Sequence, residues 1–296
     1  MALALVALYL IWGSTYLAMR IAVEALPPLG MAGMRFVLAG AVMLAFVRAR
    51  GAALPTPRQW ALSVPLGALL FLCGNGLVVL AERTLDSSIA AVVCATTPLI
   101  ACGISSMTRE RPSRAELAGT VLGFAGVAVL ALGTSLASNG VRGLYVLFAP
   151  VGWAIGSLLA KRTNATGLGC AGAQMLSGGV WMLVASAASG EHLPHVLPLR
   201  AVLAWSYLVV FGSLVGFSAY VYLLRTTRPA VAMSYAYVNP VVALFVGALL
   251  GGEHVGTSTV VATVLIAAGV MTAVVFKSVR SDRVAAPSSG PCRDAS

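Results

Sequence analysis

Apolar stretches of about twenty residues, separated by short polar segments, follow one another from the N-terminus almost to the end of the chain. About twenty apolar residues are enough for an α-helix to cross a bilayer. The pattern predicts an all-α integral membrane protein with ten transmembrane helices, at residues 3–19, 29–47, 60–80, 89–107, 117–136, 144–160, 170–189, 203–224, 231–250 and 256–276.

The ninth stretch differs from the others because it carries polar residues near its middle. Ser234, Tyr235, Tyr237 and Asn239 lie there, directly before Pro240. Proline removes one backbone donor and leaves a carbonyl without a partner, which is tolerated at membrane depth only against protein or a water-filled cavity. We therefore expect this helix to line a hydrated cavity.

A weaker copy of this stretch lies upstream. Residues 83–98 match residues 225–240 without a gap, at a constant offset of 142 residues, and four of the sixteen positions are identical. Both segments end on a proline. Two apolar helices that are interrupted at corresponding midpoints point to the binding site of a transporter. The sequence therefore predicts helix breaks at Pro98 and Pro240.

The composition supports membrane insertion. With 59% hydrophobic and 9% charged residues and a mean hydropathy of +0.93, the chain lacks the polar surface that a soluble protein of this length needs. The first apolar run has no basic start and contains Trp12 and Tyr16 where a signal peptide would have small residues, so we expect the first helix to be retained. The five cysteines have no metal-binding or secretory spacing, which favours packing roles.

The net charge of +10 reports orientation in the membrane and not nucleic-acid binding, because the basic residues lie in short loops. If the N-terminus is cytoplasmic, fourteen of the nineteen Lys and Arg residues fall in cytoplasmic segments and four in outer segments. The positive-inside rule then predicts that both termini are cytoplasmic.

Five spans in each half would give the two halves opposite orientations. The sequence accordingly predicts two inverted five-helix repeats, residues 1–142 and 143–280, followed by a disordered cytoplasmic tail at 281–296. Glu110 and Glu253 occupy matching positions in the two repeats, at an offset of 143 residues. In the predicted orientation Glu110 is cytoplasmic and Glu253 lies on the outer side.

Four stretches together resemble a known family: I-W-G-S-T-Y-L-A-M-R from Ile11, M-R-F-V-L-A-G from Met34, G-N-G-L-V-V-L-A-E from Gly74 and S-Y-A-Y-V-N-P-V-V-A from Ser234. They are similar to the EamA family of the drug/metabolite transporter superfamily, and within it to the YedA-like branch. The resemblance implies ten helices in two inverted repeats, a central cavity and alternating access. It also implies export of amino acids or small metabolites across a bacterial-type inner membrane.

Aromatic and polar residues at mid-span are the candidates for substrate binding. Trp12 lies in the middle of the first span, and Trp153 occupies the corresponding position in the second half. Helix packing and cavity lining are both open for this pair, and the polar neighbours favour lining. The full set of expected substrate-binding residues is Trp12, Ser14, Tyr16, Arg35, Asn75, Glu82, Trp153, Phe217, Tyr220, Ser234, Tyr235, Tyr237 and Asn239.

Two of these residues allow alternatives that the sequence leaves open. Arg35 lies inside the second span, where a charge is costly to expose to lipid, so it either binds a substrate carboxylate or forms a structural ion pair with Glu24 or Glu82. Asn75 lies between two glycines and either contacts a ligand or hydrogen bonds between helices. Such a lining suits an amphipathic or aromatic solute better than a phosphate ester, which calls for several basic groups.

The expected function is secondary transport of a small metabolite, with export of an amino acid or a drug-like metabolite. A polytopic membrane enzyme is disfavoured because all three histidines and all nine acidic residues fall in loops or at span ends, and a channel is disfavoured by the interrupted inverted repeats. We expect no cofactor and no metal, since His192 and His195 lack a third ligand. The expected partners are a small-molecule substrate and the lipid bilayer. We expect a monomer, with a dimer as the alternative.

The positions of the acidic residues also bear on energy coupling. Ion-coupled carriers commonly place a titratable carboxylate near the membrane midplane. No Asp or Glu lies deep in a predicted span, and Glu82, at the end of the third span, is the acid within reach of the cavity. We therefore expect facilitated diffusion or exchange driven by the substrate gradient, although carbonyls freed at Pro98 and Pro240 offer another way to hold a cation. The identity of the substrate and the direction of transport do not follow from the sequence.

Overall fold

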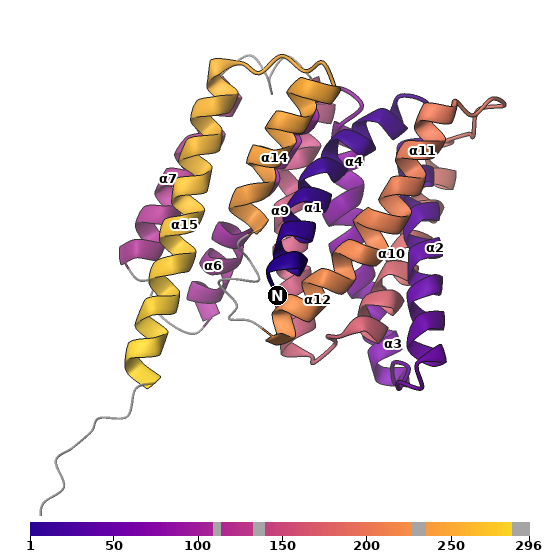
Figure 1. The fold of residues 1–296 in the computed structure, drawn as a ribbon, viewed down its shortest axis with the longest axis horizontal. Coiled ribbons are helices and arrows are strands. Elements are labelled where there is room, and N and C mark those ends of the chain that lie inside the picture. The colour runs from indigo at the N-terminus through magenta and orange to yellow at the C-terminus, as the bar shows by residue number, and fades with distance from the viewer. Residues whose placement is uncertain (109–113, 133–139, 227–234, 286–296) are drawn as a thin grey trace, which may run out of the picture.

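The computed structural model describes residues 1–108, 114–132, 140–226 and 235–285, and the regular structure within these ranges is helical throughout. The helices run side by side between two ends at which the loops gather (Figure 1). The prediction of an all-α protein is therefore confirmed.

Within the described residues, six helices are long and apolar enough to cross a membrane. They are α1 (Ala2–Val23), α2 (Pro28–Ala49), the segment Leu144–Arg162 of α9 (Gly140–Arg162), α10 (Leu168–Ala188) and two composite helices, Pro57–Ala81 and Leu199–Leu223. The other four predicted spans fall on shorter apolar stretches, Ser87–Ala101, Leu117–Val129, Val238–Leu250 and Thr257–Thr272. The chain is a multi-pass membrane protein, and ten spanning helices in inverted repeats stay a prediction.

Both composite helices contain a π-helical segment at their middle. The first consists of α3 (Pro57–Gly67), η1 (Ala68–Gly76) and α4 (Leu77–Ala81), and the second of α11 (Leu199–Tyr207), η2 (Leu208–Val215) and α12 (Gly216–Thr226). A π-helix pairs each N–H with the carbonyl five residues earlier and is frequently found at functional sites. The apolar pattern predicted both helices but not their π-helical segments.

The predicted fourth span is broken near its middle. α5 (Ser87–Cys94) and α6 (Thr97–Thr108) are separated by Ala95 and Thr96, and Pro98 is the second residue of α6. The hydroxyls of Thr96 and Thr97 each donate a 2.7 Å hydrogen bond to a carbonyl in the last turn of α5. The Thr97 bond satisfies the carbonyl of Cys94, to which Pro98, four residues later, has no N–H to donate.

The second proline behaves differently. α14 (Tyr235–Leu250) continues through Pro240, so the helix break predicted at this residue is not found. Proline removes one hydrogen bond, and the bonds on either side of it are sufficient to continue the helix.

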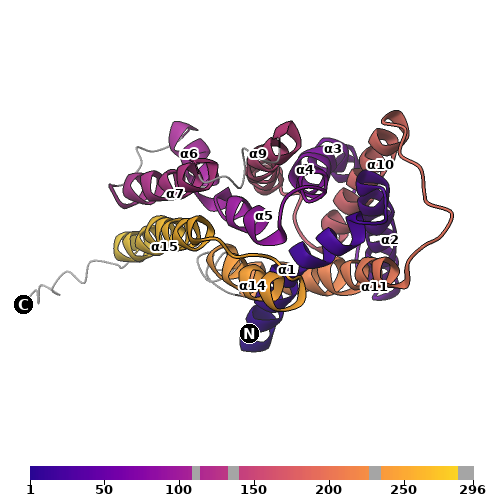
Figure 2. The same cartoon turned by 90° about the horizontal axis from the view of Figure 1, so that it is seen from above.

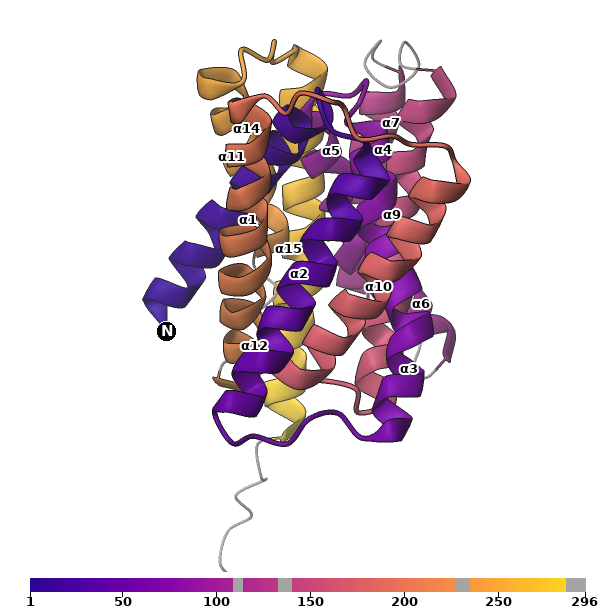
Figure 3. The same ribbon diagram turned by 90° about the vertical axis from the view of Figure 1, so that its right-hand side faces the viewer.

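Small residues let two helix pairs approach closely, one pair toward each side of the bundle (Figure 2). Between α2 and α10, a Cβ added to Gly40 would lie 2.7 Å from the carbonyl oxygen of Gly172. Between α7 (Arg114–Leu132) and α15 (Thr257–Ala285), a Cβ added to Gly269 would lie 2.6 Å from the carbonyl oxygen of Gly119. Figure 3 shows α2 and α10 adjacent along their length, and α1, α5, α9 and α14 lie between the two pairs in Figure 2.

α15 extends further than predicted. It ends at Ala285, so residues 281–285, which we assigned to the tail, belong to this helix. Their sequence, S-D-R-V-A, contains no glycine or proline that would end a helix. The remainder of the predicted tail lies outside the described residues.

Candidate functional site

A cavity of about 110 Å³ lies between the central helices. It is lined by residues of both halves of the sequence, and this volume has room for several water molecules or a small organic solute. Eight of the residues predicted to bind substrate line it: Trp12, Tyr16, Arg35, Asn75, Trp153, Phe217, Tyr235 and Asn239.

Three polar side chains of the lining have a buried atom without a hydrogen-bond partner in the described structure. These atoms are Nη1 of Arg35, Oδ1 of Asn75 and Oδ1 of Asn239. A buried polar group without a partner costs about 1–3 kcal/mol, so proteins rarely keep one without a reason. Together the three atoms supply the cavity with one cationic donor and two carbonyl acceptors.

Among the described residues, Arg35 is hydrogen bonded through Nε of its guanidinium. Its Nε donates a 2.8 Å hydrogen bond to Oγ of Ser213 in η2, and the guanidinium carbon lies 4.6 Å from the centre of the Phe36 ring. Both Glu24 and Glu82 belong to the described residues, and neither forms an ion pair with Arg35. The guanidinium charge therefore remains available to a solute in the cavity.

Aromatic rings form a continuous wall of the cavity. The ring of Trp12 lies 5.3 Å from that of Phe217 and 4.9 Å from that of Tyr235, measured between centroids. The ring of Trp153 lies 6.2 Å from that of Phe217. Such rings bury apolar groups and also attract cations to their faces.

The π-helical segment η2 positions Trp12. The indole Nε1 donates a 3.2 Å hydrogen bond to the carbonyl of Gly212 in η2. Gly216, the first residue of α12, leaves space for the ring, because a Cβ at this position would collide with the indole nitrogen. A π-helical turn and a glycine thus hold a cavity-lining aromatic ring from the opposite half of the chain.

Three of the described residues that were predicted to bind substrate lie outside the lining: Ser14, Tyr220 and Glu82. Oγ of Ser14 is 2.7 Å from the hydroxyl of Tyr207 in α11, so this side chain connects two helices and does not line the cavity. Tyr220 lies behind the wall, with its ring 5.3 Å from Trp12 and 5.8 Å from Tyr235. Polar and aromatic residues occur on more than one face of these helices, so their depth in the span did not show which of them turn inward.

Of the remaining predicted residues, Glu82 is described and Ser234 is not. Glu82 follows the span Pro57–Ala81, is 0% exposed and does not line the cavity. Neither of its carboxylate oxygens has a hydrogen-bond partner among the residues that the structure describes. Ser234 and the side chain of Tyr237 lie outside the described residues, so their predicted roles stay predictions.

Burial raises the pKa of Glu82 well above its ordinary value. The charge of Glu253 raises this pKa further, and the positive charges of Arg20 and Arg35 oppose the rise. The folded protein therefore favours the neutral form of the Glu82 carboxyl.

Several lining residues were not predicted from the sequence. Thr15 and Met19 share a helix face with Trp12 and Tyr16, since these positions are three, four and seven residues apart. This spacing was a signal that sequence reasoning missed. Thr97 lies at the break between α5 and α6, which the neighbouring proline marks. Small residues of the lining, such as Gly212, carry no chemical signal of their own.

Two stretches that together cover most of the chain, residues 1–132 and 142–275, match the EamA-like transporter family. The chain belongs to this family. Among EamA-like relatives, the "Uncharacterized inner membrane transporter YedA" of Escherichia coli (strain K12) is 44% identical over 252 residues, which are 84% of this chain and 82% of that protein. The predicted resemblance to the EamA family and to YedA is therefore confirmed.

More distant proteins agree with this assignment. The S-adenosylmethionine/S-adenosylhomocysteine transporter of Chlamydia trachomatis (serovar L2) is 28% identical over 259 residues, 82% of this chain and 79% of that protein. A solved crystal structure with 23% sequence identity has the same fold, with a TM-score of 0.65 over 93% of this chain and 97% of that chain. The EamA-like chain is accordingly a multi-pass inner-membrane transporter.

Proposed function

We propose that this EamA-like protein is a secondary transporter that carries a small zwitterionic metabolite, such as an amino acid, by alternating access. The observation that carries the proposal is the set of polar atoms without partners in the cavity, Nη1 of Arg35 and Oδ1 of Asn75 and Asn239. A carboxylate would pair with the guanidinium, and an ammonium group would donate to the amide oxygens. One solute that carries both groups would satisfy all three atoms.

The aromatic wall supports a solute with an apolar or aromatic body. The rings of Trp12, Trp153, Phe217 and Tyr235 all line the cavity, and they would bury such a body while the two charged groups face Arg35 and the amides. In a volume of about 110 Å³ only a small solute fits without movement of the walls, and a larger one requires the helices to separate.

A relative favours the same chemistry. The Chlamydia trachomatis protein is named as a transporter of S-adenosylmethionine and S-adenosylhomocysteine. Both compounds end in an amino-acid group with an ammonium and a carboxylate. The cavity described above would bind the same amino-acid group that a site for these two compounds must bind.

We infer that the chain consists of two inverted five-helix halves, residues 1–142 and 143–280, and that the cavity between the central helices opens to each side in turn. The family match supports this division, because it falls in two stretches on either side of residues 133–141. The π-helical segments η1 and η2 support it as well, since each lies at the middle of a long helix in its own half.

The substrate gradient is the proposed driving force, by facilitated diffusion or exchange. This is supported by the lining of the cavity, in which the described residues include no aspartate or glutamate. A polytopic membrane enzyme is the alternative from another class, and no group of three His, Cys, Asp or Glu residues gathers anywhere in the described part of the chain. A channel is the other alternative, and it would not require a site with three specific polar atoms.

The test is counterflow by the purified full chain in liposomes that are loaded with one amino acid at a time. We expect saturable counterflow, and we expect analogues that lack the carboxylate or the amine to compete at least about tenfold more weakly, which corresponds to about 1.4 kcal/mol. In Arg35→Gln, discrimination against the analogue without a carboxylate should disappear. Flux without saturation or counterflow would indicate a channel, and equal competition by all analogues would reject the zwitterion proposal.

A further inference from the structure

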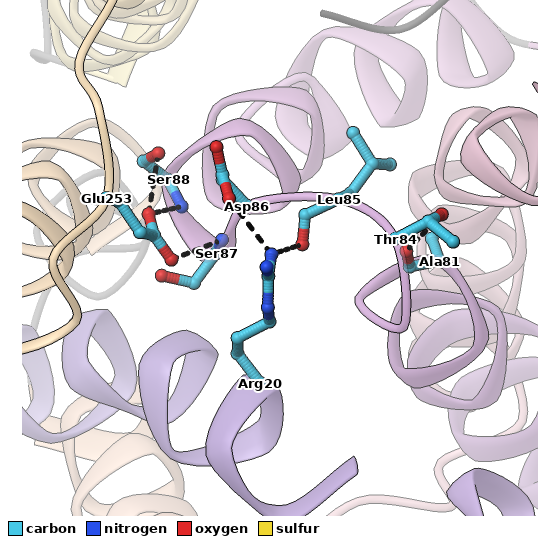
Figure 4. Close-up of polar contacts among 8 residues, drawn as sticks. All are labelled: Arg20, Ala81, Thr84, Leu85, Asp86, Ser87, Ser88 and Glu253. Carbon is cyan, nitrogen blue, oxygen red and sulfur yellow. Dashed lines mark hydrogen bonds and ion pairs between the residues drawn. The ribbon is translucent and has the colours of Figure 1, made fainter. Parts of the chain in front are cut away.

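The carboxylate of Glu253 connects the two halves of the sequence at the end of the bundle that is uppermost in Figure 1 (Figure 4). Its Oε1 accepts a 2.8 Å hydrogen bond from the backbone N–H of Ser87. Its Oε2 accepts hydrogen bonds from the N–H (3.2 Å) and the hydroxyl (2.9 Å) of Ser88. These residues begin α5, where N–H groups lack helical partners and the helix dipole favours a negative charge.

The end of α14 aims Glu253 at this position. Gly252 has a left-handed backbone with φ of +64°, and the N–H of Glu253 donates a 3.0 Å hydrogen bond back to the carbonyl of Gly247. A left-handed glycine of this kind commonly ends a helix and turns the chain sharply. Gly247 also leaves room for the carboxylate, since a Cβ there would lie 2.5 Å from Oε2. The turn therefore places the carboxylate directly over the start of α5.

The helices joined by this contact separate the cavity from the upper end. α5 contributes Cys94 to the cavity and α14 contributes Asn239. Ser87 and Ala90 of α5 and Ala243 of α14 are each 0% exposed, and α5 and α14 pack against each other. Solvent does not reach these residues, and we take the packed helices as closing the cavity toward this end.

A second polar contact holds the same loop from the side of α1. Nη1 of Arg20 forms a 3.0 Å ion pair with Oδ1 of Asp86 and also donates to the carbonyl of Leu85 (Figure 4). The start of α5 is thus held both by α1, within its own half, and by Glu253, from the other half. Of these two contacts, that of Glu253 is the one made by a residue of the other half of the sequence.

We propose that Glu253 is the outer gating residue of the transport cycle: its carboxylate holds α5 while the cavity is closed to the outer side, and it leaves α5 when the cavity opens to that side. The inference rests on the alternating access stated under the proposed function and on the orientation that the charged loops predict. Release of Glu253 exposes two helix N–H groups and one hydroxyl to water, so the contact adds to the free energy of opening.

The chain contains a matched control. Glu191, in the loop after α10, accepts hydrogen bonds from the N–H groups of Leu29 (3.3 Å) and Gly30 (2.9 Å) at the start of α2, and from the Ser186 hydroxyl (2.7 Å). The chemistry is the same as at Glu253. However, the backbones of α2 and α10 approach closely, because a Cβ added to Gly33 would lie 3.0 Å from the carbonyl oxygen of Gly179. In addition, no residue of α10 lines the cavity. Glu191 therefore does not close a route to the cavity.

The test uses Cys94, which lines the cavity, as the reporter. In the full chain with the other four cysteines replaced by serine, a membrane-impermeant maleimide is added outside intact cells, and the rate at which Cys94 is modified is measured. Glu253→Gln replaces one carboxylate oxygen, which accepts hydrogen bonds, by an amide NH2 group, which donates them. The amide group cannot accept the hydrogen bonds that Ser88 donates. We expect this variant to react about tenfold faster than the parent, because the population of the open state follows the lost free energy, and we expect Glu191→Gln to react at the parent rate.

Ser88→Ala removes only the hydroxyl contact and should give a smaller increase, which keeps the test available if Glu253→Gln fails to fold. Equal rates in the parent and in the folded variants would overturn the proposal, and so would an increase seen only from the cytoplasmic side in inverted vesicles. Labelling requires no substrate. If counterflow is normal and Cys94 is labelled at the same rate in the parent and in Glu253→Gln, the gating proposal alone is rejected. If counterflow is absent and labelling is faster in Glu253→Gln, the transport proposal alone is rejected.

Discussion

Asn239 and Ser14 are polar residues in apolar spans, and their surroundings differ. Oδ1 of Asn239 is buried at the cavity without a partner, whereas Ser14 is hydrogen bonded to Tyr207. Asn239→Leu should therefore lower counterflow about tenfold or more and leave the folded yield unchanged, since removal of an unpaired polar atom does not reduce stability.

Ser14→Ala should cost about 1 kcal/mol of stability and leave the apparent affinity unchanged. Both are measured by counterflow and by recovery in size-exclusion chromatography, and equal losses of yield and transport in Asn239→Leu would indicate a packing role.

Glu82 makes a prediction about pH. Because its pKa in the folded protein is raised by burial above the ordinary value of 4.5, the folded state keeps a proton that the unfolded chain loses as the pH rises. The stability that the neutral carboxyl contributes is fully present below the unfolded pKa and is lost as the pH rises through the folded pKa. The melting temperature in detergent should fall with rising pH, and Glu82→Gln should flatten this dependence. Glu24→Gln, at an exposed position, is the control; an unchanged slope in Glu82→Gln would contradict the expectation.

At the scale of the element, the contact between α2 and α10 depends on the absence of side chains. Gly40→Ala would place a Cβ 2.7 Å from backbone atoms of Gly172 and Leu176, and backbone cannot move aside as the end of a side chain can. We expect a loss of about 1–3 kcal/mol, as for other overpacked sites, seen as a lower melting temperature. Gly103→Ala in α6 is the control, since a Cβ there meets nothing within 4 Å and alanine favours the helix. Similar melting temperatures for the two variants would show that the close approach is not required.

The helices themselves were predictable because apolar stretches of membrane length leave few other structures open. Their irregularities were less so. Pro98 marks a break, yet α14 continues through Pro240, and nothing in the apolar runs distinguishes the π-helical segments from ordinary α-helix. Whether a helix breaks depends on the groups that satisfy the freed backbone atoms, as the Thr97 hydroxyl does for the carbonyl of Cys94.

For the whole molecule, transport driven by the substrate gradient predicts that an ion gradient alone does not drive accumulation of the substrate. With substrate equal on both sides of a liposome membrane, an imposed pH or sodium gradient should produce no net accumulation, because no described carboxylate lines the cavity. A substrate gradient under the same conditions should produce flux, which is the positive control. Accumulation driven by either ion would refute facilitated diffusion, and its loss in Glu82→Gln would identify the coupling group.

The site was predictable in its residue types and less so in its geometry. Mid-span tryptophan, asparagine and arginine have few stable positions in a membrane other than a polar interior, so Trp12, Asn75 and Arg35 were found from depth alone. The direction of each side chain was harder to predict, and Ser14 and Tyr220 turn away from the cavity. The role of Glu253 needed the structure, because a loop glutamate is ordinary until the helix that it caps is known.

The π-helical segments also suggest how members of the family differ from one another. A single-residue deletion within 68–76 or 208–215 would convert a π-helical turn into an α-helical one and leave the flanking helices in register, so another residue would face the solute in place of Asn75 or Gly212. The loops and the helix order would stay as they are. Relatives whose alignment has a one-residue gap in either segment should therefore carry different solutes, and the same solutes in gapped and ungapped relatives would argue against this route of divergence.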